Sequence, residues 1–179
     1  MTKKMKKGLT LIEICIGVVI VSLLMVTVMK LLGTGMSGSQ KGLSHLANME
    51  AASILMSQIE YDLMRAYELT DPPVGEKSIS ARWKMLTDET IPDTTATVTY
   101  QNLDEAVKRT LIENGSTLEH TYCRGLKTVI SFEKVRFTDP KTGGEKQGLW
   151  INLSVASPKK ISGETEKFEL KRLIMCKNF

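Results

Sequence analysis

The hydrophobic and polar positions divide the chain into three stretches, and the first is apolar on every side of a helix. Residues 9–32 contain one acid, Glu13, and one base, Lys30, among 24 residues. As an α-helix this stretch is about 36 Å long, which exceeds the ~30 Å hydrocarbon core of a bilayer. An apolar surface all round predicts a membrane-spanning helix rather than a surface helix with one buried stripe.

The second stretch, residues 33–70, predicts an amphipathic extension of the same helix. It starts with four glycines between positions 33 and 42. Glycine costs up to about 1 kcal/mol in a helix interior, so this start is a candidate for a bend or a melted segment. The run Asp71-Pro72-Pro73 cannot continue a helix, and we expect the helix to end near Thr70. One apolar stripe with spacings of three and four follows the glycines: Ala52, Leu55, Met56, Ile59, Leu63 and Ala66.

In the third stretch the apolar positions repeat every second residue, which is the period of a half-buried β-strand. Asn114-Gly115 between two such runs predicts a hairpin turn. Strands after a long helix predict an α+β fold, in which the helix packs on an antiparallel sheet formed by residues 71–179. The seven expected strands are residues 78–86, 96–100, 106–113, 117–122, 126–137, 149–155 and 168–175.

Composition and charge narrow the classes of function. A chain of 179 residues, 42% hydrophobic and 25% charged, is long enough for one domain and is neither collagen-like, low-complexity nor disulfide-dense. The net charge of +4 comes from Lys3, Lys4, Lys6 and Lys7, since without them 20 of the 24 basic residues balance 20 acidic residues. The bulk charge therefore does not indicate a basic nucleic-acid-binding face.

Gly8 and Glu13 are the two unusual residues at the start of the apolar stretch. Gly8 separates the lysines from the apolar run, and Glu13 lies five residues further on. A carboxylate at membrane depth costs roughly 2.5–3.5 kcal/mol, so such a residue usually has a partner. If the chain were cut after Gly8, Leu9 would carry a free α-amino group with a pKa of ~8. That cation and the Glu13 carboxylate of an adjacent subunit could neutralise each other at low dielectric.

Other interpretations of this segment stay open. Glu13 could reach the lipid headgroups from near the end of the helix without any partner. The stretch could be a cleavable secretory signal, although its apolar run is longer than usual and no clear small-residue cleavage site follows it. It could also be a plain single-pass anchor with a basic cytoplasmic flank, or a fully buried core helix.

The stretch KKGLTLIEI, residues 6–14, resembles the class III leader of the type IV pilin and pseudopilin superfamily. That leader has basic residues, a glycine, a hydrophobic first mature residue and a glutamate as the fifth mature residue. Lys6, Lys7, Gly8, Leu9 and Glu13 match this pattern, although the first mature residue is usually phenylalanine. The resemblance implies that residues 1–8 are a leader peptide, removed between Gly8 and Leu9 by a prepilin peptidase. It also implies N-methylation of Leu9, packing of helix 9–32 into a filament core, and a role for Glu13 in subunit register.

The order of the later strands is similar to that in the minor pseudopilin J and PilW-like minor pilin families. This resemblance implies a pilin-like fold and a minor subunit that primes or caps a type IV pilus or a type II secretion pseudopilus. The partners it implies are other minor and major pilins or pseudopilins, the prepilin peptidase and the inner-membrane assembly platform. It also implies a single-pass inner-membrane protein with a cytoplasmic N-terminus and an extracytoplasmic C-terminal domain. The sequence does not choose between the pilus and the secretion pseudopilus.

The three cysteines have different settings. Cys15 lies in the apolar stretch and is best explained as a small hydrophobic residue. Cys123 and Cys176 lie in the expected extracytoplasmic domain, where disulfides persist. A bridge between them would close a loop of about 54 residues and contribute on the order of 4 kcal/mol in the chain-entropy model. Two separate thiols are the alternative.

The rest of the chain gives no catalytic or cofactor-binding pattern. His120 and Cys123 supply two ligands where a zinc site needs three or four. The acidic residues Asp88, Glu89 and Asp93 lack the spacing of an EF-hand and are expected to form a solvated loop. We therefore expect no metal site, no cofactor and no enzyme activity, and calcium binding by the acidic loop stays open as an alternative. The alternatives in other classes are a DNA-contacting competence-type pilin and a plain membrane-anchored binding module, and the scattered aromatic residues make nucleic-acid binding the weaker expectation.

Overall fold

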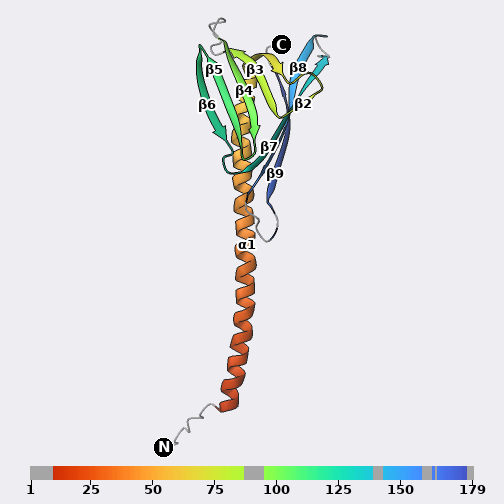
Figure 1. Cartoon of the computed structure of the whole chain (residues 1–179). Coiled ribbons are helices and arrows are strands. Elements are labelled where there is room, and N and C mark those ends of the chain that lie inside the picture. Colours follow the sequence, from red (N-terminus) through yellow and green to blue (C-terminus); the bar gives the residue numbers. More distant parts are fainter. Residues whose placement is uncertain (1–9, 87–94, 139–142, 159–162, 164, 177–179) are drawn as a thin grey trace, which may run out of the picture. The chain divides into compact units, whose positions relative to one another are not determined.

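The computed structural model describes residues 10–86, 95–138, 143–158, 163 and 165–176. It has the α+β layout expected from the sequence, with a long helix, α1 (Leu11–Met64), followed by antiparallel sheets (Figure 1). The chain divides into two compact units, Met1–Lys41 and Gly42–Phe179. The expected leader residues, 1–8, and Leu9 lie outside the described residues.

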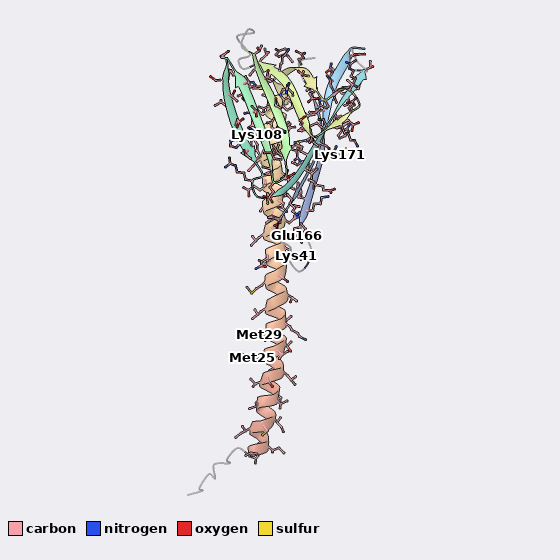
Figure 2. All side chains as sticks on the ribbon, in the orientation of Figure 1. Met25, Met29, Lys41, Lys108, Glu166 and Lys171 are labelled. Carbon is pink, nitrogen blue, oxygen red and sulfur yellow. The ribbon has the colours of Figure 1, made fainter. Side chains whose placement is uncertain are left out.

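The first unit contains the N-terminal part of α1, whose side chains are uncovered. No residue from 10 to 40 is buried, and Figure 2 shows side chains such as Met25 and Met29 projecting from the helix. By length and composition, this helix could cross a membrane. The chain stays α-helical through the four glycines between positions 33 and 42, so the melted segment considered for them is absent.

In the second unit, the remaining part of α1 buries the predicted apolar stripe. Ala52, Leu55, Met56, Ile59 and Leu63 are each at most 1% exposed, as the sequence predicts. They share one hydrophobic core with residues from both sheets. The largest strand residues in that core are Trp83, Val98, Tyr100, Ile130, Phe132, Leu149, Ile151 and Leu153.

The helix ends at Met64 rather than near Thr70, which corrects the predicted boundary. The N–H of Arg65 donates to the carbonyl of Asp62 at 3.3 Å, and β1 (Ala66–Asp71) begins directly afterwards. β1 pairs with β3 (Ser80–Leu86). Ala66 and Leu69 are both buried, and their three-residue spacing fits a helix stripe as well as this irregular strand. Pairing with β3 makes these residues a strand rather than a helix, and the spacing of apolar residues alone does not predict that pairing.

The strands form two antiparallel sheets instead of the single sheet expected. The five-stranded sheet has the order β1-β3-β4-β5-β6 and the four-stranded sheet the order β2-β7-β8-β9. All seven predicted strands have a counterpart, but the predicted strand 78–86 is divided between β2 and β3, which belong to different sheets, and β1 is additional. The remaining bounds are β2 (Lys77–Ser78), β4 (Thr95–Leu103), β5 (Ala106–Glu113), β6 (Ser116–Tyr122), β7 (Lys127–Thr138), β8 (Glu145–Ala156) and β9 (Lys167–Met175).

The turn between β5 and β6 confirms the predicted hairpin. Asn114 and Gly115 have φ angles of 50° and 78°, and positive φ at both central residues is what a type I′ turn requires. The turn fixes the register so that Glu113 pairs with Ser116 and Arg109 pairs with His120. The side chain of Arg109 thereby lies on the same face of the sheet as the buried Tyr100, its partner on β4.

Candidate functional site

The start of α1 places Glu13 in a local hydrogen-bond arrangement. The backbone N–H and the hydroxyl of Thr10 both donate to Oε2 of Glu13 at 2.9 Å. Thr10 precedes the first helical residue and Glu13 is the third residue of the helix, so the pair forms one half of a capping box. Sequence reasoning missed this role, although the spacing Thr10-x-x-Glu13 signals it. Within the described residues, Oε1 of Glu13 accepts no hydrogen bond.

The N-terminal part of α1 also carries small residues among its large apolar ones. Gly17 has no neighbouring heavy atom within 4 Å of the position that a Cβ would occupy. Gly17 and Ser22 line an open groove along the helix together with Ile14, Val21 and Met25. Small residues of this kind let a second helix approach closely, because helix association in lipid depends on van der Waals packing.

The part of α1 in the second unit has a second apolar stripe, which sequence reasoning missed. Leu43, Leu46, Ile54, Tyr61 and Met64, called the outer stripe here, are each between 53% and 65% exposed. At about 100° per residue they fall within an arc of ~80°, opposite the buried stripe. The apolar residues of the outer stripe can be found in the sequence, but they are spaced 3, 8, 7 and 3 residues apart. The more closely spaced residues of the buried stripe make this pattern hard to recognise. This segment of the helix is therefore apolar on two opposite sides.

Asp62, near the end of α1, faces the five-stranded sheet and is fully buried. Oδ2 of Asp62 accepts hydrogen bonds from the Tyr100 hydroxyl at 2.7 Å and from Nε of Arg109 at 2.7 Å. Oδ1 accepts from Nη2 of Arg109 at 3.0 Å and from Nε2 of Gln58 at 3.1 Å. The four bonds satisfy a carboxylate that is fully removed from water, as a buried charge requires.

The electrostatics of this network are consistent with a fixed ion pair. Burial, and then the charge and hydrogen bond of Asp62, raise the pKa of Tyr100, so its hydroxyl stays neutral and donates. Burial alone would lower the pKa of Arg109, but its hydrogen bond and ion pair with Asp62 outweigh burial and raise the pKa. The sequence does not predict this network, because nothing local to Asp62 indicates that Arg109 and Tyr100 reach it. The network joins α1 to the five-stranded sheet.

Of the two alternatives left open for Cys123 and Cys176, the structure has the separate thiols, and its geometry gives the reason. Cys123 and Cys176 are both free thiols. Cys123 lies beside Thr128, near the start of β7. The N–H of Cys176 donates to the carbonyl of Gln147, which pairs with Arg136. Thr128 and Arg136 are eight positions apart on one strand, or about 26 Å, whereas a disulfide needs Cα atoms within ~7 Å.

The two histidines lie against aromatic rings. The ring centroid of His120 is 4.5 Å from that of Tyr122, and His45 is 5.8 Å from Phe168. No group of three or more His, Cys, Asp or Glu side chains that could hold a metal ion occurs in the described part of the chain. Asp88, Glu89 and Asp93 lie outside the described residues, as do Lys3, Lys4, Lys6, Lys7 and Gly8.

The chain matches no family model, no curated protein and no solved structure. The described features that bear on function are the uncovered apolar helix with Glu13 at its start, the outer stripe, and the surface of the two sheets.

Proposed function

We propose that this protein is a minor pilin or minor pseudopilin, a structural subunit that primes or caps a filament after cleavage between Gly8 and Leu9. The observation that carries the proposal is the uncovered first unit, where no residue from 10 to 40 is buried. Such a helix needs lipid, sister helices or both to cover it. The pilin-like fold, the inner-membrane location and the cytoplasmic N-terminus belong to the same proposal.

Glu13 supplies the polar contact of the proposed assembly. Its Oε2 atom is bound by Thr10 of the same chain, and no described residue donates to Oε1, so the proposed contact uses a cation from a neighbouring subunit. The free α-amino group that cleavage creates on Leu9 of a neighbouring subunit is such a cation. In a water-poor helix bundle this pairing is much stronger than at a surface, which favours one axial register between subunits.

The outer stripe extends the apolar contact beyond the membrane span. Ile54, Tyr61 and Met64 face away from the core that Leu55 and Ile59 join. In the proposed filament, apolar surfaces of neighbouring subunits would cover the outer stripe. Partners of the subunit are thus other pilins or pseudopilins, together with the peptidase and the assembly platform that process and extract it.

N-terminal sequencing of the protein from its native host tests the proposal. We expect a mature chain that starts at Leu9, and an unshifted precursor in Gly8→Glu, because the peptidase subsite has no room for a side chain there. Gly35→Ala is the matched control, since its Cβ would meet no atom within 4 Å and the leader is unchanged. An intact Met1 in the wild type, or normal processing of Gly8→Glu, contradicts the proposal.

A further inference from the structure

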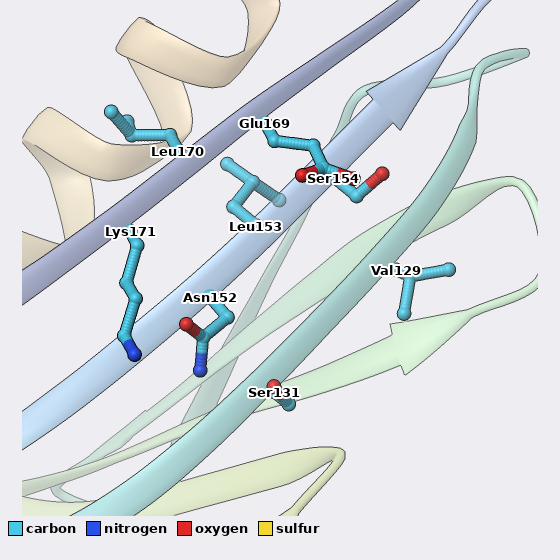
Figure 3. Close-up of a pocket in the computed structure, with 8 residues that line it drawn as sticks. All are labelled: Val129, Ser131, Asn152, Leu153, Ser154, Glu169, Leu170 and Lys171. Carbon is cyan, nitrogen blue, oxygen red and sulfur yellow. The ribbon is translucent and has the colours of Figure 1, made fainter.

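The outward face of the four-stranded sheet carries an open groove of about 450 Å³ (Figure 3). Two cross-strand rows line it. Ser131 on β7 pairs with Asn152 on β8, which pairs with Lys171 on β9. The next row is Val129, Ser154 and Glu169 in the same strand order. The alternate residues on these strands, including Ile130 and Leu153, belong to the core, so the side chains of the two rows face away from it. Leu153 and Leu170 complete the lining of the groove between the rows.

Three polar side chains in this groove have no hydrogen-bond partner among the described residues. Ser131, Asn152 and Ser154 make no side-chain hydrogen bond to any other group in the described part of the chain. Each of them can both donate and accept, since a hydroxyl or a primary amide has both functions. Rows in a sheet repeat at about 4.8 Å between strands and about 6.7 Å along a strand. The groove therefore presents several donor–acceptor groups at fixed and regular separations.

The groove contains one carboxylate, Glu169, and one ammonium group, Lys171, and each already contacts another side chain. Glu169 forms an ion pair with Lys167, and the Lys171 ammonium lies 4.9 Å from the ring centroid of Trp150. A phosphate or another strong anion would find one cation and one carboxylate facing it. Large aromatic side chains, methionine and arginine dominate the cores of protein interfaces, whereas serine, lysine and glutamate are depleted there. The composition of this groove thus disfavours both an ionic ligand and a protein partner.

We propose that the β7–β9 groove binds a neutral oligosaccharide. The hydroxyl groups of a sugar both donate and accept, which matches Ser131, Asn152 and Ser154. The carbon-bound hydrogens of its ring faces suit the apolar side chain of Val129, which is 60% exposed. An open groove rather than an enclosed pocket fits a segment of a longer chain. This binding would be additional to filament assembly and does not depend on the proposed function.

Titration of the full-length protein with cellotriose, maltotriose and chitotriose tests this site. A detergent without a sugar headgroup is needed, and saturation-transfer NMR gives the direct signal of binding. Trp150 supplies a second signal, since the other tryptophan, Trp83, is fully buried. We expect at least one trisaccharide to saturate with a Kd of ~1 mM or tighter. Asn152→Ala should weaken that binding at least about tenfold, as expected for lost hydrogen bonds.

Thr99→Ala is the matched control, because Thr99 is a half-buried polar residue on the other sheet and its loss should leave sugar binding unchanged. Four outcomes overturn the proposal. They are no saturable binding of any of the three trisaccharides, equal binding by Asn152→Ala, and tighter binding of inorganic phosphate than of the sugars. The fourth is a change in oligomeric mass in Asn152→Ala, which would assign the groove to contact with a second copy.

Discussion

At the scale of single residues, the Asp62 network gives the clearest energetic prediction. Asp62→Asn removes the charge that Arg109 pairs with, and the side chain of Arg109 is only 14% exposed. We expect a loss of about 3 kcal/mol in the free energy of unfolding, since an unpaired buried charge is costly. Denaturant unfolding followed at Trp83 measures it, because that ring stacks on Tyr100 at 5.3 Å.

The matched control for this prediction is Glu60→Gln. Glu60 forms an ion pair with Arg172 at 2.8 Å, but the two side chains are 26% and 51% exposed. Solvent screens such a pair, so its loss should change stability by less than about 1 kcal/mol. Equal effects of the two substitutions would mean that burial does not determine how much the Asp62–Arg109 pair contributes to the free energy of unfolding.

Cys176 gives a prediction about pH. Burial raises the pKa of its thiol to about 11, from the ordinary value of 9.0. Between these two pH values the unfolded chain has lost the proton and the folded chain has kept it, so stability falls as the pH rises. At pH 11 the loss from this group is about 2 kcal/mol. Cys176→Ala should make the fall between pH 9 and 11 shallower by that amount, and an unchanged slope would refute the assignment.

At the scale of elements, the two apolar sides of α1 predict that neighbouring residues have opposite roles. Leu55 is fully buried and Ile54 is 54% exposed. Leu55→Ala should destabilise the protein by about 3 kcal/mol, through lost burial and a cavity. Ile54→Ala should change stability by no more than about 0.5 kcal/mol and yet reduce incorporation into filaments. Unfolding curves and quantification of the subunit in sheared filaments separate the two effects.

The elements also show what a sequence can and cannot predict. The apolar span, the buried stripe, the Asn114-Gly115 turn and all seven strand positions follow from local periodicity and turn chemistry. The end of the helix does not, because Ala66 and Leu69 fit both a helix and a strand until β3 pairs with them. The division into two sheets and the reach of Arg109 to Asp62 depend on contacts across 47 positions and more. Local patterns contain no information about such contacts.

At the scale of the whole molecule, Glu13 has one role within its chain and a second role in the proposed assembly. Within its chain, the carboxylate accepts two hydrogen bonds from Thr10 and caps α1. Between chains, the proposed function uses its negative charge to pair with the Leu9 amine of a neighbour. A substitution to alanine removes both roles at once, so loss of filaments in Glu13→Ala would not distinguish them.

Glu13→Gln separates the two roles. Glutamine also completes a capping box, so the helix start is preserved while the charge disappears. We expect Glu13→Gln to be cleaved after Gly8 and inserted normally, but to enter filaments at least about tenfold less than the wild type, because one unit charge pair at low dielectric exceeds 1.4 kcal/mol. Thr10→Ala is the complementary control, since it removes the hydroxyl donor and keeps the carboxylate charge. Normal incorporation of Glu13→Gln together with failure of Thr10→Ala would show that capping, and not pairing between subunits, is the function of Glu13.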